Sequence, residues 1–294
     1  MVAGFRRSLS FPKPKSPSHA PEKPYHVRST SLPNRSHPSV FQIREQLQSL
    51  KSWDNRADKG TSAWLCAGLN QIKNLHHSLD DLLQLDQFQA PLRRRADLAE
   101  DLLDHSLRFV DAYGILRAAL VGLKEEQLGA QVAIRRRDAA VVAARLKAQR
   151  KIQRELVKAV AMVREIGKSP TSVGIADGDA EVAGIVRDVN AATAAVSVAA
   201  LCGVSAPSSN ARTTALKSWV GLKRKQGVEC GLVRLREFEE ACGENLRSWK
   251  EDEKMALRRL EALEVAIVGI ERESERVFRS LINTRVSLLN VLTQ

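Results

Sequence analysis

Aromatic residues are scarce in this sequence and make up 4% of its 294 residues. The core therefore has to be built mainly from Leu, Ala and Val, within a hydrophobic content of 44%. β-Sandwiches usually rely on β-branched and aromatic side chains, whereas helices packed on helices do not need them. The composition therefore favours an all-α fold.

Cysteine is also scarce, with four residues at Cys66, Cys202, Cys230 and Cys242. No two of them form a Cys-x-x-Cys pair, and no spacing among them suits a zinc site. We therefore expect reduced, buried thiols in an intracellular protein.

The sequence lacks the motifs of a catalytic or metal centre. No Gly-rich phosphate loop follows a strand pattern, and no Ser or Cys lies in a nucleophile-elbow context. His76 and His77 are adjacent, so on a helix they diverge by roughly 100° and cannot bind one metal ion together. Asp80 lies one turn beyond His76 and could complete a weak metal site, but this spacing is more often a solvent-facing hydrogen bond. We predict no enzyme activity, no metal and no cofactor.

The least polar part of the chain, residues 189–206, lacks charge but consists mostly of small residues. A membrane span needs about 20 strongly apolar residues, so this run favours a buried, closely packed helix over a spanning one. No secretory signal is expected, because no apolar stretch follows the first basic residues. The Ser/Arg-rich start leaves a plastid or mitochondrial transit peptide open. We expect an intracellular protein, cytoplasmic in the simplest case, with membrane association and a plastid location as alternatives.

Positive charge is concentrated in two segments of the chain. The formal net charge is +12. Residues 1–39 contribute +6 and residues 135–168 contribute +8, so the rest of the chain sums to −2. Two local patches make the protein basic.

Proline is unevenly distributed, because seven of the ten prolines lie between positions 12 and 38. Such a Ser/Pro-rich, basic segment buries too little apolar surface to offset its ordering entropy. We therefore predict a disordered tail over residues 1–37 and a helical bundle domain over residues 38–294. Linkers are predicted near residues 168–178 and 203–212.

Apolar residues at helical spacing predict the first two helices of the bundle. The first begins with Pro38 at its N1 position. The second is capped by Thr61 or Ser62, and one of its faces is predicted to be buried. That face carries Leu65, Leu69, Ile72, Leu79 and Leu83.

The later helices are predicted to be longer. A third helical region starts with Pro91 at N1 and continues to about residue 167, with a bend where Gly122 and Gly129 weaken helix propensity. A fourth is capped by Asp179, which explains the acidic run around it better than a calcium loop does, and it ends near residue 201. The last region runs from about residue 213 almost to the C-terminus.

The last helical region contains the sharpest periodicity in the chain. Eight of the ten seam positions are apolar, which predicts coiled-coil-like packing against an earlier helix of the same chain or, less simply, a second copy. The seam is Leu260, Leu263, Ile267, Ile270, Ser274, Val277, Leu281, Thr284, Leu288 and Val291. The whole chain is predicted to be an elongated all-α bundle of long antiparallel helices.

A basic helix is predicted over residues 135–158. It could meet the phosphates of an anionic membrane or of nucleic acid, or it could be a solvated or internally paired face. Nucleic acid is disfavoured, because no aromatic residue for base stacking occurs between Tyr113 and Trp219. The candidate residues are Arg135, Arg136, Arg137, Arg145, Lys147, Arg150, Lys151, Arg154 and Lys158.

A phosphorylation motif lies in the basic tail. Arg28, Ser29, Ser31 and Pro33 match the pattern Arg-Ser-x-Ser-x-Pro, which 14-3-3 proteins bind when the second serine is phosphorylated. The arginine suits a basophilic kinase, and the phosphate adds about two negative charges for an arginine cluster to bind. We therefore predict a 14-3-3 partner through Ser31.

The chain resembles the BYPASS-like plant proteins in several blocks that occur in order. These blocks are "YHVRSTSLPNRSHPSVFQIREQLQSLK", "GLNQIKNLHHSLDDLLQL", "LAEDLLDHSLRFVDAYGILRAAL" and "LRRLEALEVAIVGIERESERVFRSLINTRVSLLNVLTQ". The resemblance covers residues 25–294 and is less specific over residues 168–212. It implies an all-helical plant protein without known catalytic activity and with a role in root and shoot development.

Two hypotheses follow from the residues and the resemblance together. The first is a non-enzymatic regulator of plant development that acts through protein interactions of its helical bundle. The alternative is a peripheral membrane adaptor that docks through the basic helix at 135–158 and the basic tail.

Overall fold

The computed structural model describes residues 37–166, 177–205, 233–241 and 248–293. Every regular element in these ranges is helical, which confirms the predicted all-α class. The elements are α1 (Pro38–Trp53), α2 (Ser62–Leu83), α3 (Asp86–Arg94), α4 (Ala96–Arg135), α5 (Ala139–Ile166), α6 (Asp177–Val204), α8 (Arg236–Glu240), η2 (Ser248–Lys250) and α10 (Glu253–Thr293).

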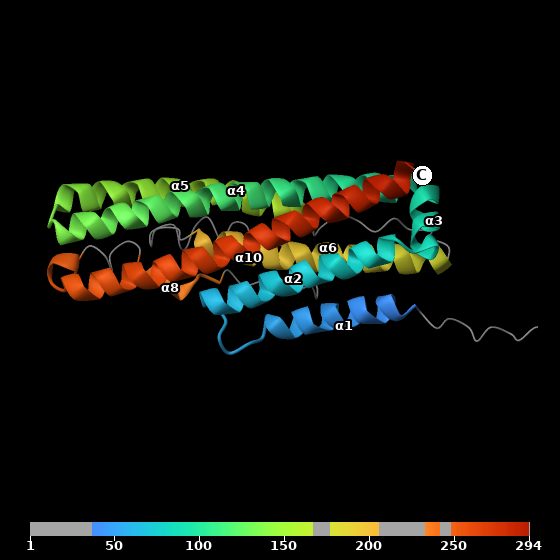
Figure 1. Ribbon diagram of the computed structural model, residues 1–294, viewed down its shortest axis with the longest axis horizontal. Helices are drawn as coiled ribbons and strands as arrows, with labels where there is room; N and C mark the ends of the chain where they lie inside the picture. The colour runs from blue at the N-terminus through green and yellow to red at the C-terminus, as the bar shows by residue number, and fades with distance from the viewer. Residues whose placement is uncertain (1–36, 167–176, 206–232, 242–247, 294) are drawn as a thin grey trace, which may run out of the picture. The chain divides into compact units, whose positions relative to one another are not determined.

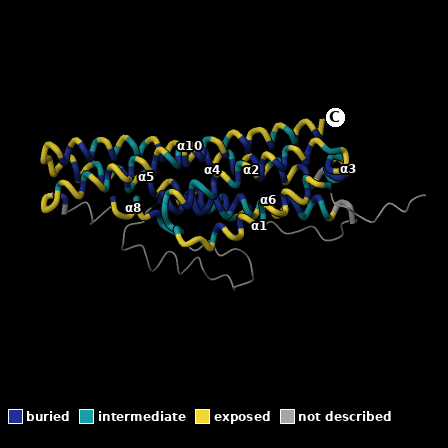
Figure 2. Tube along the Cα trace, turned by 60° about the horizontal axis from the view of Figure 1, so that its bottom comes forward, coloured by how far each residue is buried: buried dark blue, intermediate teal, exposed yellow. Residues whose placement is uncertain are grey.

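The described helices from His37 onward belong to one compact unit. Helices α2, α4, α5, α6 and α10 run side by side, α1 lies along α2, and α3 crosses one end (Figure 1). Helix α10 packs along α4 and α2, and α5 packs along α4 and α6. The core lies between these helices, and α6 is buried over most of its length (Figure 2). The tail predicted over residues 1–37 lies outside the described residues except for His37.

Helices α1 and α2 form a hairpin that is held by two tryptophans. Pro38 occupies the start of α1, and Thr61 caps α2 by accepting a hydrogen bond from the backbone N–H of Trp64 at 3.1 Å, as predicted. The rings of Trp53 and Trp64 stack with centroids 4.3 Å apart. Each indole N–H donates to the backbone carbonyl of the other tryptophan, at 2.8 and 3.0 Å. Gly68 makes room for this stack, because a Cβ there would lie 2.5 Å from the Trp53 ring.

The prediction that Pro91 begins a long helix is wrong. Helix α3 begins at Asp86, and Pro91 lies inside it. Phe88 and Leu92 are buried, so the apolar side of α3 faces the bundle end. Proline removes one intrahelical hydrogen bond, and α3 ends at Arg94. The chain then re-enters a helix at Ala96.

The predicted bend at Gly122 and Gly129 is also wrong, because the chain reverses further on. Helices α4 and α5 are joined by residues 136–138, where Arg137 adopts a left-handed conformation with φ 55°. Asp138 caps α5 by accepting from the N–H of Val141 at 3.0 Å. Such a short connection makes the two helices antiparallel neighbours.

The two glycines of α4 permit the close approach of α5. A Cβ on Gly122 would lie 3.0 Å from Ile152, and a Cβ on Gly129 would lie 2.6 Å from Arg145. In each pair the two residues are equally far in sequence from Arg137, so both contacts belong to one register of the hairpin. These glycines therefore set a helix–helix distance and do not bend α4.

Helix α6 begins at Asp177, before the predicted cap Asp179, and extends to Val204. Residues 180–204 of α6 are long and apolar enough to cross a membrane by length and composition, but 67% of the window that qualifies is buried inside the bundle. This burial agrees with the prediction of a closely packed core helix. The predicted linkers lie mainly outside the described residues.

The last helical region is interrupted before its longest helix. Residues 233–235 are not helical, and α10 begins at Glu253, where Asp252 accepts from the N–H of Met255 at 2.8 Å. The predicted start near residue 213 lies outside the described residues. All ten predicted seam residues of α10 are buried. They pack on helices of the same chain, of which α4 runs antiparallel to α10 and α2 runs parallel to it.

Candidate functional site

The described residues contain no group of three or more His, Cys, Asp or Glu side chains that could hold a metal ion. The helices present four candidate functional features: a buried histidine, a cationic stripe, a groove beside that stripe and an exposed apolar face. We describe them in this order.

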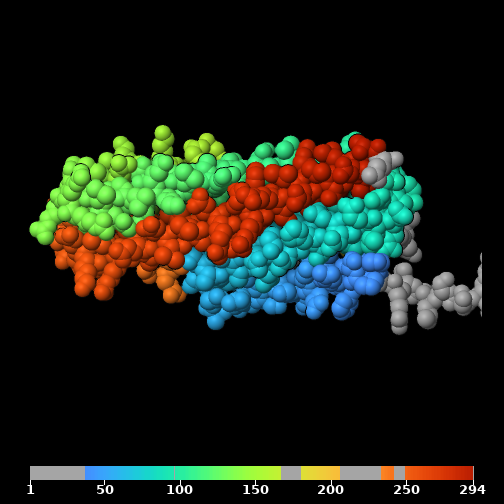
Figure 3. Space-filling view, in the orientation of Figure 1, coloured from blue at the N-terminus to red at the C-terminus, as the bar shows by residue number. Residues whose placement is uncertain are grey.

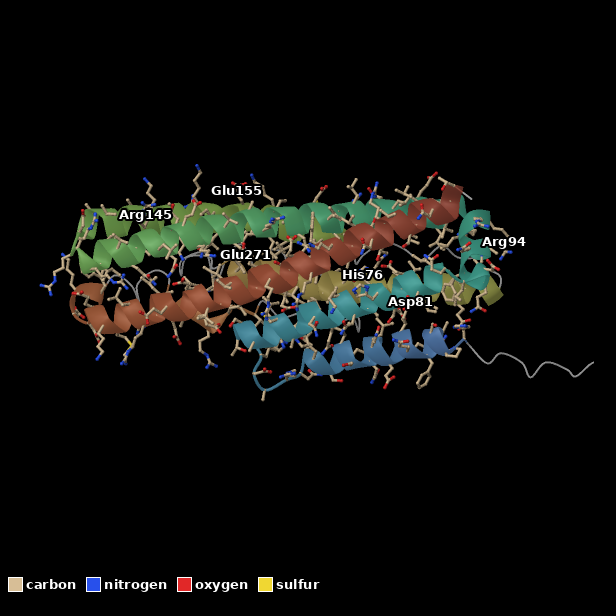
Figure 4. The ribbon with its side chains drawn as sticks, viewed as in Figure 1. His76, Asp81, Arg94, Arg145, Glu155 and Glu271 are labelled. Atoms are coloured by element: carbon tan, nitrogen blue, oxygen red, sulfur yellow. The ribbon has the colours of Figure 1, made fainter. Side chains whose placement is uncertain are left out.

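His76 is buried, so the predicted solvent-facing hydrogen bond is wrong. Its ring lies in the core between three helices (Figure 4) and is 3% exposed. Nδ1 lies 3.2 Å from the hydroxyl of Thr284 in α10, and Nε2 lies 3.1 Å from the hydroxyl of Thr193 in α6. A neutral imidazole has one N–H, so it donates to only one of the two threonine hydroxyls.

Burial explains the electrostatics around His76. Desolvation lowers the pKa of His76 to about 4, so the ring is neutral at physiological pH. One turn later, burial raises the pKa of Asp80 to about 6. The sequence held a signal for this arrangement, because His76 continues the buried stripe between Ile72 and Leu79, and Thr284 interrupts the apolar seam of α10.

The space beside His76 is too small for a substrate. A cavity of about 20 Å³ is lined by His76, Ser106, Asn190 and Thr284 together with apolar side chains. This volume holds about one water molecule. The cluster therefore connects α2, α6 and α10 through hydrogen bonds and offers no room for chemistry on a ligand.

The nine predicted basic residues do not lie on one helix. Arg135, Arg136 and Arg137 lie at the turn between α4 and α5, and Arg137 pairs with Glu253 of α10 at 3.4 Å. Arg145 lies on α5 (Figure 4). It pairs with Glu126 of α4 at 3.3 Å. A single basic helix over residues 135–158 is therefore wrong.

Four of the nine residues form a continuous stripe on α5. Lys147, Lys151, Arg154 and Lys158 follow one another at intervals of four, three and four residues, so they share one side of the helix. All four are exposed. Lys158 pairs with Glu155 at 2.9 Å, whereas the other three make no ion pair with a described residue. We call these four residues the cationic stripe.

A groove of about 340 Å³ lies beside the cationic stripe, between α5 and the short helix η2. The apolar side chains of Val142, Leu146 and Trp249 are buried along it. Its lining is Ala139, Val142, Ala143, Leu146, Lys147, Arg150, Trp249 and Lys250. Sequence analysis found Lys147 and Arg150 but missed the groove, because η2 is far from α5 in sequence.

Exposed large apolar side chains gather on two adjacent helices. Of the fifteen in the described ranges, twelve lie on α4 and α10. Figure 3 shows α4 and α10 next to each other on one face of the bundle. We call the following set the apolar face: Leu107, Ile115, Val121, Leu128, Val132, Met255, Val265, Val268, Ile282, Val286, Leu289 and Leu292.

Salt bridges connect the two helices of the apolar face. Arg117 of α4 pairs with Glu275 of α10 at 3.2 Å, and Lys124 lies 3.9 Å from Glu271. These pairs tie α4 to α10 along the exposed side of the two helices. The predicted phosphorylation motif around Ser31 lies outside the described residues.

The fold and these surfaces define an all-α bundle protein with exposed helix faces as its candidate contact sites. Comparison with known families identifies it further, because the profile of the family described as Protein BPS1 matches residues 68–291. The chain belongs to this BYPASS-related plant family, which confirms the resemblance inferred from the sequence. Searches of curated proteins and of solved structures found no match.

Proposed function

We propose that the protein is a non-enzymatic regulator of plant root and shoot development that acts through protein contacts of its helical bundle. Membership of the BPS1 family supports a developmental role. The small cavity beside His76 and the lack of a metal-binding cluster in the described ranges give no support to a catalytic role. The regulator acts inside the cell, with the cytoplasm as the simplest location.

The observation that carries this proposal is the apolar face on α4 and α10. Apolar side chains scattered singly over a surface need no explanation, whereas twelve of the fifteen in the described ranges gather on two adjacent helices, which favours a contact site there. Val265 is 74% exposed and Val286 is 49% exposed, and both lie within the regular helix α10. Nothing in their own helix requires an apolar side chain at these positions.

The spacing along the apolar face fits a partner that presents helices. Val121, Leu128 and Val132 are separated by seven and four residues, and Val286 and Leu289 are separated by three. Residues three, four and seven apart form a single row on a helix, and two such rows receive another helix by knobs-into-holes packing. The partner is therefore a protein with an amphipathic helix.

The test introduces charge into the apolar face without disturbing the core. Val268→Glu and Val286→Glu change residues that are 44% and 49% exposed. The matched control changes Val141 and Val157 of α5 to Glu, which are 39% and 55% exposed. Each double variant is expressed in plants that lack the protein, and root and shoot growth is scored together with proximity labelling of neighbours.

We expect the variant of the apolar face to fail in restoring growth and to lose specific labelled neighbours, while circular dichroism shows unchanged helicity. The α5 control should restore growth. Full rescue by the apolar-face variant at normal protein levels would contradict the proposal.

A second function, docking to an anionic membrane surface, is favoured by the cationic stripe and the basic tail. Lys and Arg near an anionic bilayer each contribute about 1 kcal/mol, and this attraction weakens with added salt. The test is sedimentation of the full chain with anionic vesicles at low and high salt. Salt-sensitive binding that is lost when Lys151 and Arg154 become Glu would support this function, and absence of binding at low salt would exclude it.

A further inference from the structure

The groove between α5 and η2 combines two features that ordinary surface depressions lack. It has an apolar floor, and it has several cations around its opening. We propose that this groove binds a small anionic amphiphile, a molecule with one carboxylate or phosphate group on an apolar chain or ring. This inference goes beyond protein contacts of the bundle and does not depend on the apolar face.

The floor of the groove is made by side chains from two parts of the chain. Val142 and Leu146 come from consecutive turns of α5 and are 2% and 7% exposed, and Trp249 of η2 is 5% exposed. Ala139 and Ala143 widen the groove because their side chains end at Cβ. An apolar chain placed here would remove its own surface from water, which contributes about 25 cal/mol per Å².

The opening of the groove carries positive charge from both sides. Lys147 and Arg150 come from α5, and Lys250 comes from η2. None of the three forms an ion pair with a described residue, and no Asp or Glu is among the lining residues that the structure describes. The charge of the groove is therefore complementary to an anion, and a guanidinium and two ammonium groups suit a carboxylate or phosphate.

Size selects a small molecule for this groove. A volume of about 340 Å³ lies at the lower end of the range for ligand pockets, which is roughly 300–1,000 Å³. The ring of Trp249 is buried in the floor and has no free face for base stacking. A single-chain amphiphile fits these limits better than a nucleotide does.

The groove and the cationic stripe are separable by mutation. Lys147 belongs to both, whereas Lys158 belongs to the stripe but does not line the groove. The two lysines are eleven residues apart on α5, which corresponds to about 16 Å along a helix. A matched pair of charge reversals at these positions therefore distinguishes a ligand in the groove from general attraction of anions to α5.

The probe is dodecanoate, used below its micelle concentration and titrated into the full chain by calorimetry. Dodecyltrimethylammonium has the same chain length with the opposite charge and is the control ligand. The variants are Lys147→Glu, Lys158→Glu and Ala143→Phe, the last of which fills the groove from an exposed position. A photoactivatable analogue of dodecanoate, followed by mass spectrometry, locates the bound chain.

We expect dodecanoate to bind with one-to-one stoichiometry and to crosslink within residues 139–150 or at Trp249. Lys147→Glu should weaken binding at least tenfold, Ala143→Phe should abolish it, and Lys158→Glu should leave it within twofold. Equal weakening by both charge reversals, equal binding of the cationic control, or absence of binding to the wild type would each overturn the proposal. None of these results bears on the apolar face, and vesicle binding tests the membrane function separately.

Discussion

At the scale of single residues, His76 shows how a polar side chain can tie helices together inside an apolar core. Each ring nitrogen reaches a threonine hydroxyl on a different helix, so the ring fixes the relative register of α2, α6 and α10. Removing one partner of a buried hydrogen bond leaves the other unsatisfied, which costs about 1–3 kcal/mol. Burial disfavours the charged ring, so the folded chain holds His76 in its neutral form near pH 7.

We predict that acid weakens the fold through His76. The unfolded chain binds a proton near pH 6.5, whereas the folded chain binds it only near pH 4, so stability falls as the pH falls through this window. Between pH 7 and pH 4, wild type should lose roughly 2–3 kcal/mol more free energy of unfolding than His76→Gln. Urea denaturation at the two pH values measures the difference.

Asp80 acts in the opposite direction within part of the same window. Its folded pKa is raised to about 6, so its protonation on acidification favours the folded state. Both proteins in the comparison keep Asp80, and the difference between them isolates His76. Equal pH dependence of wild type and His76→Gln would show that His76 does not carry the effect.

Gly68 is a second residue on which the fold depends. We predict that Gly68→Ala destabilises the protein by about 1–3 kcal/mol, because the added Cβ would overlap the Trp53 ring. The matched control is Gly114→Ala in α4, where no atom lies within 4 Å of the new Cβ. That change should stabilise the protein by about 0.5–1 kcal/mol. Thermal unfolding of both variants tests this, and similar effects of the two changes would refute the steric explanation.

At the scale of helices, the five-residue helix α8 stabilises the start of α2. Glu237 of α8 accepts hydrogen bonds from the backbone N–H and the hydroxyl of Ser62, at 3.0 and 2.6 Å. A carboxylate at the N-terminus of a helix also interacts favourably with the helix dipole. The start of α2 is therefore capped from a distant part of the chain.

We predict that Glu237→Ala lowers the free energy of unfolding by about 1 kcal/mol, the usual cost of a lost helix cap. Glu240→Ala is the matched control, because Glu240 is an exposed residue of the same helix. Chemical denaturation of the two variants provides the measurement. If both variants were as stable as the wild type, the cap would have no energetic role.

Helix faces were predictable from sequence, whereas several helix ends were not. The stripe of α2 and the ten-residue seam of α10 are buried as their spacing predicted. Apolar residues recur at helical spacing because one face of each helix packs in the core. The reversal at Arg137 was missed because a left-handed arginine carries no turn signature, although Asp138 before Ala139 was a usable cap signal. The helix start predicted at Pro91 is wrong because the short helix α3 tolerates a proline in its interior.

The candidate sites were less predictable than the helix faces, because they depend on which distant segments of the chain lie together. The groove is lined by both Leu146 and Trp249, which are about 100 residues apart in the chain, and local spacing cannot reveal such a pairing. The basic residues were found individually, but their division between the turn, α4 contacts and the cationic stripe depends on the hairpin.

At the scale of the whole molecule, the sequence predicts a second kind of contact, through the tail. We predict that phosphorylated Ser31 retains a 14-3-3 protein, because Arg28 and Pro33 complete the motif. A Ser31→Ala chain should lose this retention in a pull-down, and phosphatase treatment of the wild type should have the same effect. Retention that survives both treatments would exclude Ser31 as the contact.

The paired tryptophans of the first hairpin also provide an optical signal that reports on the packing of α1 against α2. Two indoles stacked 4.3 Å apart are close enough to couple their electronic transitions, and the in-plane angle between the rings sets the strength of the resulting exciton signal in circular dichroism. Separation of α1 from α2 would extinguish that signal while leaving helicity almost intact. The chain thus contains its own optical reporter for detachment of its first helix.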